Sequence, residues 1–167
     1  PHFCVSIGVQ VRGIMEHGVI YNPVSNELFT ATKGSGAQLD ERRIRVSDCK
    51  GVASGLICTG FATYKRSNQD ENVCMQRLKK VIDNSAGMRR TGSAALDLAY
   101  VAAGRLDGFW EAGLKPWDMA AGSLLVREAG GFVGDFVAGD DFMRSGNIVA
   151  ATTKVYPELL ALLKPAE

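Results

Sequence analysis

Two short segments place a polar side chain at the start of an apolar helix, where it could contact an anion or a metal ion. Asp118 begins the run DMAAGSLLVREAGG, and Ser93 lies at the start of GSAALDLAYVAAG. A helix N-terminus exposes unpaired backbone N–H groups and the positive end of the helix dipole, which suits an anionic or hydroxyl-bearing ligand. The alternative is structural, because Asp and Ser are preferred N-cap residues that each stabilise a helix by about 1 kcal/mol.

Glu111 ends the strand-like segment RLDGFWE. Open α/β sheets usually bind ligands at the C-terminal ends of their strands. Glu111, Asp118 and Ser93 could therefore meet in one polar pocket, although a glutamate is more often an exposed surface residue. The neighbouring Trp110 and Trp117 are interpreted as core or wall residues rather than as platforms that stack on a ligand. From the residues alone, Asp118 could cap its helix, hold a metal ion, or do both.

The elements that would position these residues divide the chain into two halves. Up to about Ser47 the pattern is strand-like with short turns, which predicts an antiparallel meander. From Gly51 onward strands and helices alternate, which is typical of an α/β layer. We therefore predict a layered α/β (α+β) fold. Residues 1–50 would be the remainder of an N-terminal antiparallel-sheet domain, and residues 51–167 a C-terminal α/β domain.

Periodicity and turn residues locate the elements of the second half. A polar loop over 63–72, with Ser67 and Asp70 in a capping pattern, leads into a helix. Four apolar residues of that helix are predicted to share its buried face: Val73, Leu78, Val81 and Ile82. Further helices are expected over 92–104, 118–131 and 156–164, and strands over 55–61, 105–111, 131–136 and 146–152.

Composition excludes several classes of protein. A formal net charge of +1 provides no electrostatic footprint for nucleic acid or for an anionic membrane. No apolar run approaches the roughly 20 residues of a membrane-spanning helix. The four cysteines show neither a CxxC pair nor metal-ligand spacing, so we expect free thiols in a reducing cytoplasm: Cys4, Cys49, Cys58 and Cys74.

Beyond these local patterns, the run RRTGSAALDLAYVAAGRLDGFWEAGLKPWDMAAGSLLVREAGG closely resembles the inositol monophosphatase family. The resemblance is strongest to the bacterial SuhB-type (extragenic suppressor) branch of that family. The upstream run GVIYNPVSNELFTATKGSGAQLDERRIRVS fits the same family, so the resemblance covers nearly the whole chain. The PWDMAAG segment followed by EAGG is far more specific than a lone glycine motif.

The resemblance implies a fold, a chemistry and a set of site residues. Members are Mg²⁺-dependent, lithium-sensitive phosphatases with a layered αβαβα fold. By the same resemblance Asp118 is a metal ligand and Glu111 contacts an inositol hydroxyl, while Gly92, Ser93 and Ala94 line the substrate pocket. Asp118 would both cap its helix and hold Mg²⁺, since a carboxylate offers about four acceptor sites.

The chain departs from the family pattern in one respect. The family's other metal ligands lie in a Glu-bearing segment and in a DP[IL]DGT motif, and the catalytic threonine lies in the latter. Neither motif occurs here, and both would belong upstream of Pro1. No catalytic residue is therefore identifiable, and we expect this chain to be the C-terminal portion of a complete phosphatase.

The leading functional hypothesis is hydrolysis of myo-inositol 1-phosphate or a related sugar-alcohol phosphate. A related phosphatase for nucleotide 3′-phosphates or fructose bisphosphate is the alternative within enzymes, and Glu111 at the inositol-contact position favours the first. The SuhB-type resemblance adds a hypothesis of another class, a partner in RNA-transcription complexes that acts through protein contacts. The segment Met88–Asp97 matches that branch well, and its arginines are expected near the surface of a homodimer. An autonomous small binding domain is the least favoured interpretation, because the sheet would keep an exposed edge.

Overall fold

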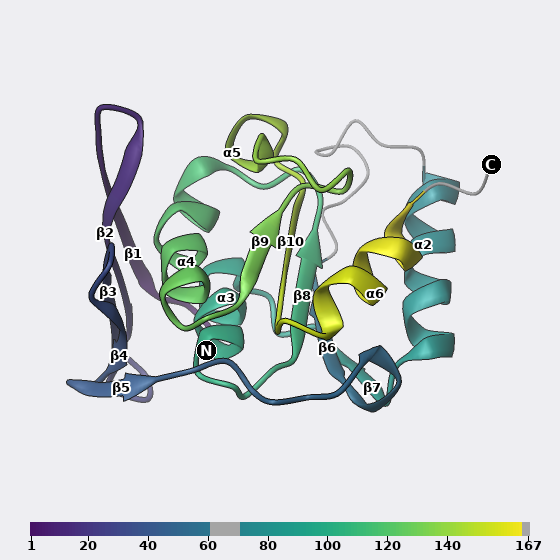
Figure 1. Ribbon diagram of the computed structural model, residues 1–167, viewed down its shortest axis with the longest axis horizontal. Coiled ribbons are helices and arrows are strands. Elements are labelled where there is room, and N and C mark those ends of the chain that lie inside the picture. Colours follow the sequence, from purple (N-terminus) through teal and green to yellow (C-terminus); the bar gives the residue numbers. More distant parts are fainter. Residues whose placement is uncertain (61–70, 165–167) are drawn as a thin grey trace.

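The computed structural model describes residues 1–60 and 71–164. They form four layers, an antiparallel sheet, a pair of helices, a mixed sheet and a second pair of helices (Figure 1). The prediction of a layered α/β protein is confirmed. No helix among these residues is long and apolar enough to cross a membrane.

The first half forms the predicted antiparallel meander, sheet A. Its strands follow one another in space as in sequence: β1 Val5–Val11, β2 Ile14–Asn22, β3 Glu27–Thr32, β4 Gly36–Leu39 and β5 Arg42–Ile44. Arg12 and Gly13 turn β1 into β2 with φ of 50° and 82°, a region that glycine adopts easily. Alternate residues of β1 leave the sheet on its outer side, so Val5 and Ile7 are each 51% exposed.

The second half builds sheet B, with strand order β7-β6-β8-β10-β9. Its strands are β6 Leu56–Thr59, β7 Gly87–Arg89, β8 Gly108–Glu111, β9 Phe132–Gly134 and β10 Ile148–Ala151. β6 pairs in parallel with both β7 and β8, whereas β10 is antiparallel to β8 and β9. The C-terminal ends of β6, β7 and β8 therefore open on the same edge of the sheet. The three-residue strand β7 was not predicted.

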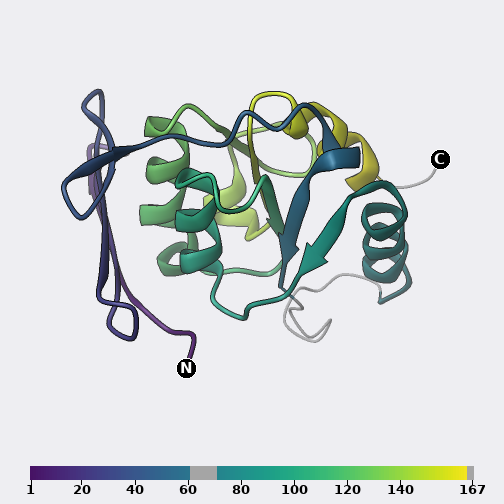
Figure 2. The same cartoon turned by 90° about the horizontal axis from the view of Figure 1, so that it is seen from below.

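Two pairs of helices cover the faces of sheet B. These four helices are α2 Glu71–Asn84, α3 Ala94–Ala102, α4 Pro116–Glu128 and α6 Val155–Leu163. A further short helix, α5, spans Phe142–Ser145. A 3-10 turn, η1, spans Val52–Ser54. The helices α3 and α4 lie between the two sheets, and α2 and α6 cover the far face of sheet B (Figures 1 and 2). The capping pattern predicted at Ser67 and Asp70 lies outside the described residues.

One prediction about α2 is wrong. Val81 and Leu78 are buried as expected, but Ile82 is 50% exposed. The buried face instead includes Arg77, whose Nε donates to the carbonyl of Leu163 at 2.7 Å. The guanidinium of Arg77 also lies 4.7 Å from the centre of the Phe136 ring, and such a paired cation can replace an apolar residue at a helix interface.

The main hydrophobic core joins both sheets through the central helices. Ile20 and Phe29 of sheet A, Leu98 of α3, Leu125 of α4 and Phe109 of sheet B belong to one cluster of buried side chains. A second cluster fills the space between sheet B and the outer helices α2 and α6. The division into domains at residue 50 stays a prediction. The buried face of sheet A shares its core with the central helices of the second half.

The central helices approach each other closely at Gly122. A Cβ atom built on Gly122 of α4 would lie 2.5 Å from the Cβ of Leu98 on α3. Gly18 of β2 closely approaches the other side of α4, since its Cβ would lie 2.9 Å from the carbonyl oxygen of Ala121. Contacts this short leave no room for a side chain, so these glycines set the spacing of sheet A, α4 and α3.

We predict that Gly122→Ala destabilises the full-length protein by about 2 kcal/mol, because overpacking outweighs the gain of about 1 kcal/mol in helix propensity. The free energy of unfolding from urea titrations measures the effect. Gly87→Ala is the matched control, since its nearest neighbour is the flexible end of Leu56 at 3.4 Å. Equal stability of the Gly122→Ala variant and the wild type would contradict the packing argument.

Candidate active site

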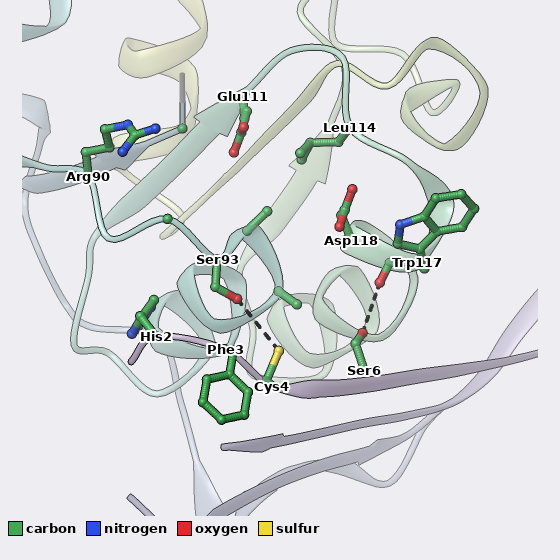
Figure 3. A pocket seen from close by; sticks show the side chains of 14 residues that line it. His2, Phe3, Cys4, Ser6, Arg90, Ser93, Glu111, Leu114, Trp117 and Asp118 are labelled. Carbon is green, nitrogen blue, oxygen red and sulfur yellow. Dashed lines mark hydrogen bonds between the residues drawn. The ribbon is translucent and has the colours of Figure 1, made fainter. Parts of the chain in front are cut away.

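The five residues singled out by the sequence line one cavity of about 520 Å³. The cavity lies at the edge where β6, β7 and β8 end, between the starts of α3 and α4 and the first residues of the chain (Figure 3). Gly92, Ser93 and Ala94 come from the start of α3, and Glu111 and Asp118 come from the ends of the segment that joins β8 to α4. Parallel strands followed by helices bring such residues together, as predicted.

Glu111 is the most buried polar side chain of the cavity. It ends β8, its exposed fraction is 9%, and no hydrogen bond joins its carboxylate to another described residue. Burial raises the pKa of Glu111 to about 7, with a further rise from the charges of Asp97 and Asp118, while Arg90 acts in the opposite direction. Glu111 can therefore donate or accept a hydrogen bond near neutral pH.

Gly60 is a site residue that the sequence reasoning missed. It lies directly after β6 and lines the same cavity. A Cβ built on Gly60 would fall 2.0 Å from Oε2 of Glu111, so any larger residue would displace the glutamate. A glycine at the C-terminal end of a buried parallel strand is the signal that could have identified it.

Ser93 occupies the predicted N-cap of α3, but its side chain does not cap the helix. Its hydroxyl instead lies 3.7 Å from Sγ of Cys4, on the wall of the cavity (Figure 3). The preceding Gly92 has φ of 102°, which a residue with a side chain rarely adopts. The capping interpretation of Ser93 is therefore wrong for its hydroxyl, because the loop turns that group toward the cavity.

The position of Asp118 in its helix also differs from the prediction. α4 begins at Pro116, so Asp118 is the third helical residue and not the residue that precedes the helix. Proline is favoured in this first position, because its missing N–H would be unpaired there. Oδ2 of Asp118 accepts a hydrogen bond from the backbone N–H of Lys115 at 2.9 Å, so the carboxylate still stabilises the helix start. The side chain faces the cavity (Figure 3).

The carboxylate of Asp118 could serve as one ligand of a magnesium ion. Mg²⁺ is bound in proteins by one or two carboxylates together with waters and substrate phosphate oxygens. Among the described residues, no group of three or more His, Cys, Asp or Glu side chains could hold a metal. Asp118 could therefore act as a ligand together with waters and phosphate oxygens rather than as part of an all-protein metal cage.

Asp97 is a second residue that the sequence reasoning missed. It lies in the first turn of α3 and is 1% exposed. The hydroxyl of Thr91 donates to its Oδ1. Burial raises the pKa of Asp97, while the neighbouring Thr91 hydroxyl and Cys58 thiol oppose the rise. An aspartate within the otherwise apolar helix SAALDLAYVAA was the available signal.

The raised pKa of Glu111 predicts a pH-dependent stability in metal-free protein. The folded state keeps its proton up to about pH 7, whereas the unfolded state loses it near pH 4.5, so stability falls as the pH rises through this interval. We expect the free energy of unfolding of Glu111→Gln, measured by urea titration, to rise relative to that of wild type by roughly 3 kcal/mol when the pH is raised from 4 to 8. The exposed Glu41→Gln is the control, and an identical wild-type-to-variant difference at both pH values would contradict the prediction.

The comparisons with known proteins agree on one family. The model of the inositol monophosphatase family matches residues 1–166. The Nus factor SuhB of Haemophilus influenzae is 49% identical over 165 residues, and that of Escherichia coli K12 is 51% identical over 164 residues. These matches cover 99% and 98% of this chain but only 61% of each relative, so the chain spans about three fifths of their length.

Solved structures of a SuhB protein and of an inositol monophosphatase share the fold of this chain. The extragenic suppressor protein suhB from Bartonella henselae superposes with a TM-score of 0.94 at 47% identity, covering 100% of this chain and 63% of that one. The inositol monophosphatase from Anabaena superposes with a TM-score of 0.90 at 42% identity, covering 98% of this chain and 66% of that one. With the family model matching almost every residue, the chain belongs to the inositol monophosphatase family.

Proposed function

We propose that the full-length protein is a Mg²⁺-dependent phosphatase that hydrolyses myo-inositol 1-phosphate or a related sugar-alcohol phosphate. The observation that carries the proposal is the convergence of Glu111, Ser93 and Asp118 on one cavity. The cavity volume of about 520 Å³ lies within the range of small-molecule sites. Family membership supports phosphatase chemistry in general.

The polyol part of the substrate would lie between Glu111 and the start of α3. A carboxyl group whose pKa is about 7 can exchange hydrogen bonds with a hydroxyl group in either direction. The Ser93 hydroxyl and the backbone at Gly92 and Ala94 offer further polar contacts on the opposite wall. These contacts would orient the ester bond relative to Asp118.

Asp118 would hold one coordination position of the magnesium site at the start of α4. When bound, the metal supplies neutralisation of phosphoryl charge and a lowered pKa for the attacking water. The helix start contributes its own positive potential on the same side of the cavity. Asp118 thus has two functions in the proposal, because one oxygen accepts from Lys115 and the other remains for the metal.

The charge of the cavity supports a monophosphate over a bisphosphate. Glu111, Asp97 and Asp118 are close enough for the last two to raise the pKa of Glu111. A second phosphate near Glu111 would meet these carboxylates, whereas neutral hydroxyl groups would not be repelled. Comparing turnover of inositol 1-phosphate, a nucleotide 3′-phosphate and fructose bisphosphate tests this order.

A second candidate function follows from the relatives. Proteins that are 49–51% identical to this chain bear the name Nus factor SuhB, which favours a role in transcription complexes. Arg89 and Arg90 are exposed at the end of β7, and we propose this region as part of a contact surface in a homodimer or with a partner. A cytoplasmic location belongs to the same proposal.

Asp118→Asn in the full-length protein should lower kcat/KM for myo-inositol 1-phosphate by at least about 100-fold, because a metal contributes several kcal/mol to phosphoryl transfer. The asparagine oxygen can still accept from Lys115, so the helix start and the melting temperature should be retained. Asp48→Asn, at an exposed carboxylate paired with Lys50, is the control. Activity within threefold of wild type, or an unchanged Mg²⁺ activation curve, would refute the role of Asp118.

The two candidate functions predict different behaviour of the same variant in cells. Tagged wild-type protein should co-purify with subunits of the transcription machinery, identified by mass spectrometry, and Asp118→Asn should co-purify equally well. Loss of both activity and co-purification in a variant that retains its circular dichroism spectrum would argue for one shared site. Absence of transcription subunits from the material that co-purifies with the wild-type protein would contradict the second function.

A further inference from the structure

The segment that carries Ser93 on the wall of the cavity is joined to α3 through a buried carboxylate. Asp97 is 1% exposed, and its carboxylate accepts a hydrogen bond from the hydroxyl of Thr91. Thr91 belongs to the segment between β7 and α3, and Asp97 to the first turn of α3. The buried carboxylate therefore joins this segment to the helix directly behind the cavity.

A buried carboxylate is costly unless hydrogen bonds compensate for its lost hydration. An apolar side chain at position 97 would fill the same space within α3 without that cost, since the neighbours Leu96 and Leu98 are both fully buried. The aspartate is therefore poorly explained by core packing alone. Its specific contribution is the bond to Thr91, which lies between two residues that line the cavity, Arg90 and Gly92.

Packing contributes little to holding this wall at Gly92. A Cβ built on Gly92 meets no atom within 4 Å, and the residue has φ of 102°. The Ser93 hydroxyl makes no capping bond that would fasten the loop to its helix. The segment Arg90–Ser93, here called the cavity wall, is held through side chains at Thr91, whose hydroxyl bonds Asp97, and at Ser93, whose hydroxyl lies 3.7 Å from Cys4 Sγ. The Thr91 hydroxyl is the contact that joins the cavity wall to α3.

We propose that Asp97 is a positioning residue that holds the cavity wall through Thr91 and thereby sets the selectivity of the site for a polyol leaving group. This inference rests on the proposed phosphatase function. Asp97 itself does not touch the substrate in this arrangement, because it is buried behind the wall. Its effect reaches the substrate through the positions of Arg90 and Ser93.

The test compares two substrates in the full-length protein. Selectivity is the ratio of kcat/KM for myo-inositol 1-phosphate to kcat/KM for p-nitrophenyl phosphate, whose leaving group has no hydroxyl to be oriented. Thr91→Val removes the hydroxyl that binds Asp97 and should lower this ratio about tenfold, mainly through KM for the inositol phosphate, which corresponds to the loss of one hydrogen bond. Thr91→Ser keeps the hydroxyl and should restore the ratio to within about twofold of wild type.

Thr32→Val is the matched control, because Thr32 is likewise an exposed threonine whose hydroxyl bonds a side chain, at 3.0 Å from His17 Nδ1 on sheet A. It should leave the ratio unchanged. A wild-type protein that hydrolyses neither substrate with Mg²⁺ refutes the proposed function. A wild-type protein that is active, combined with an unchanged ratio in Thr91→Val, refutes the positioning role alone.

Hydrogen exchange provides a readout that does not depend on activity. The backbone amides of residues 91–93 should exchange faster in Thr91→Val and in Asp97→Leu than in wild type, while those of β10 should not change. Asp97→Leu has a side chain of similar size but removes the oxygen that accepts from the Thr91 hydroxyl. Equal exchange rates at the cavity wall in wild type and both variants would overturn the inference even if selectivity changed.

Discussion

The site depends on the close contact between α3 and α4 across Gly122 and Leu98. The two helices approach almost backbone to backbone, and sheet A rests against the other side of α4 at Gly18. This spacing brings the starts of both helices to the edge where β6, β7 and β8 end. The packing of α3 against α4 therefore determines how far Ser93, at the start of one helix, lies from Asp118 at the start of the other. The cavity is thus a consequence of how the core packs.

Electrostatics oppose this arrangement in the protein alone. The carboxylates of Glu111 and Asp118 line the cavity and that of Asp97 is buried behind it, and burial raises the pKa of Glu111 and of Asp97. Like charges in such a region destabilise one another, and a cation or a proton relieves the repulsion. Arg90 opposes the rise in the pKa of Glu111 but comes from only one side. The repulsion between these carboxylates supports the proposed use of magnesium.

Periodic patterns predicted the meander and the α/β layer. Two helix starts and one strand end predicted that Gly92, Ser93, Ala94, Glu111 and Asp118 share one cavity, as they do, whereas their roles as metal ligand and substrate contacts stay predictions. The errors of the sequence analysis arose where segments that are distant in the sequence meet. Proline at position 116 moved the helix start ahead of Asp118, and contact with the α6 end made Arg77 the buried residue of α2 in place of Ile82. Gly60 and Asp97 were missed because their importance lies in contacts with Glu111 and Thr91, which no local spacing reveals.

The thiols beside the cavity have a consequence for chemical probes. Cys4 lines the cavity, yet burial and the charges of Asp118 and Asp97 raise the pKa of its thiol. Burial, together with the Asp97 carboxylate, raises the pKa of Cys58 to about 12. Electrophilic reagents react with thiolates and only slowly with thiols. A covalent inhibitor directed at Cys4 would therefore gain little from its place in the cavity, because burial and the nearby carboxylates both favour the unreactive thiol over the thiolate.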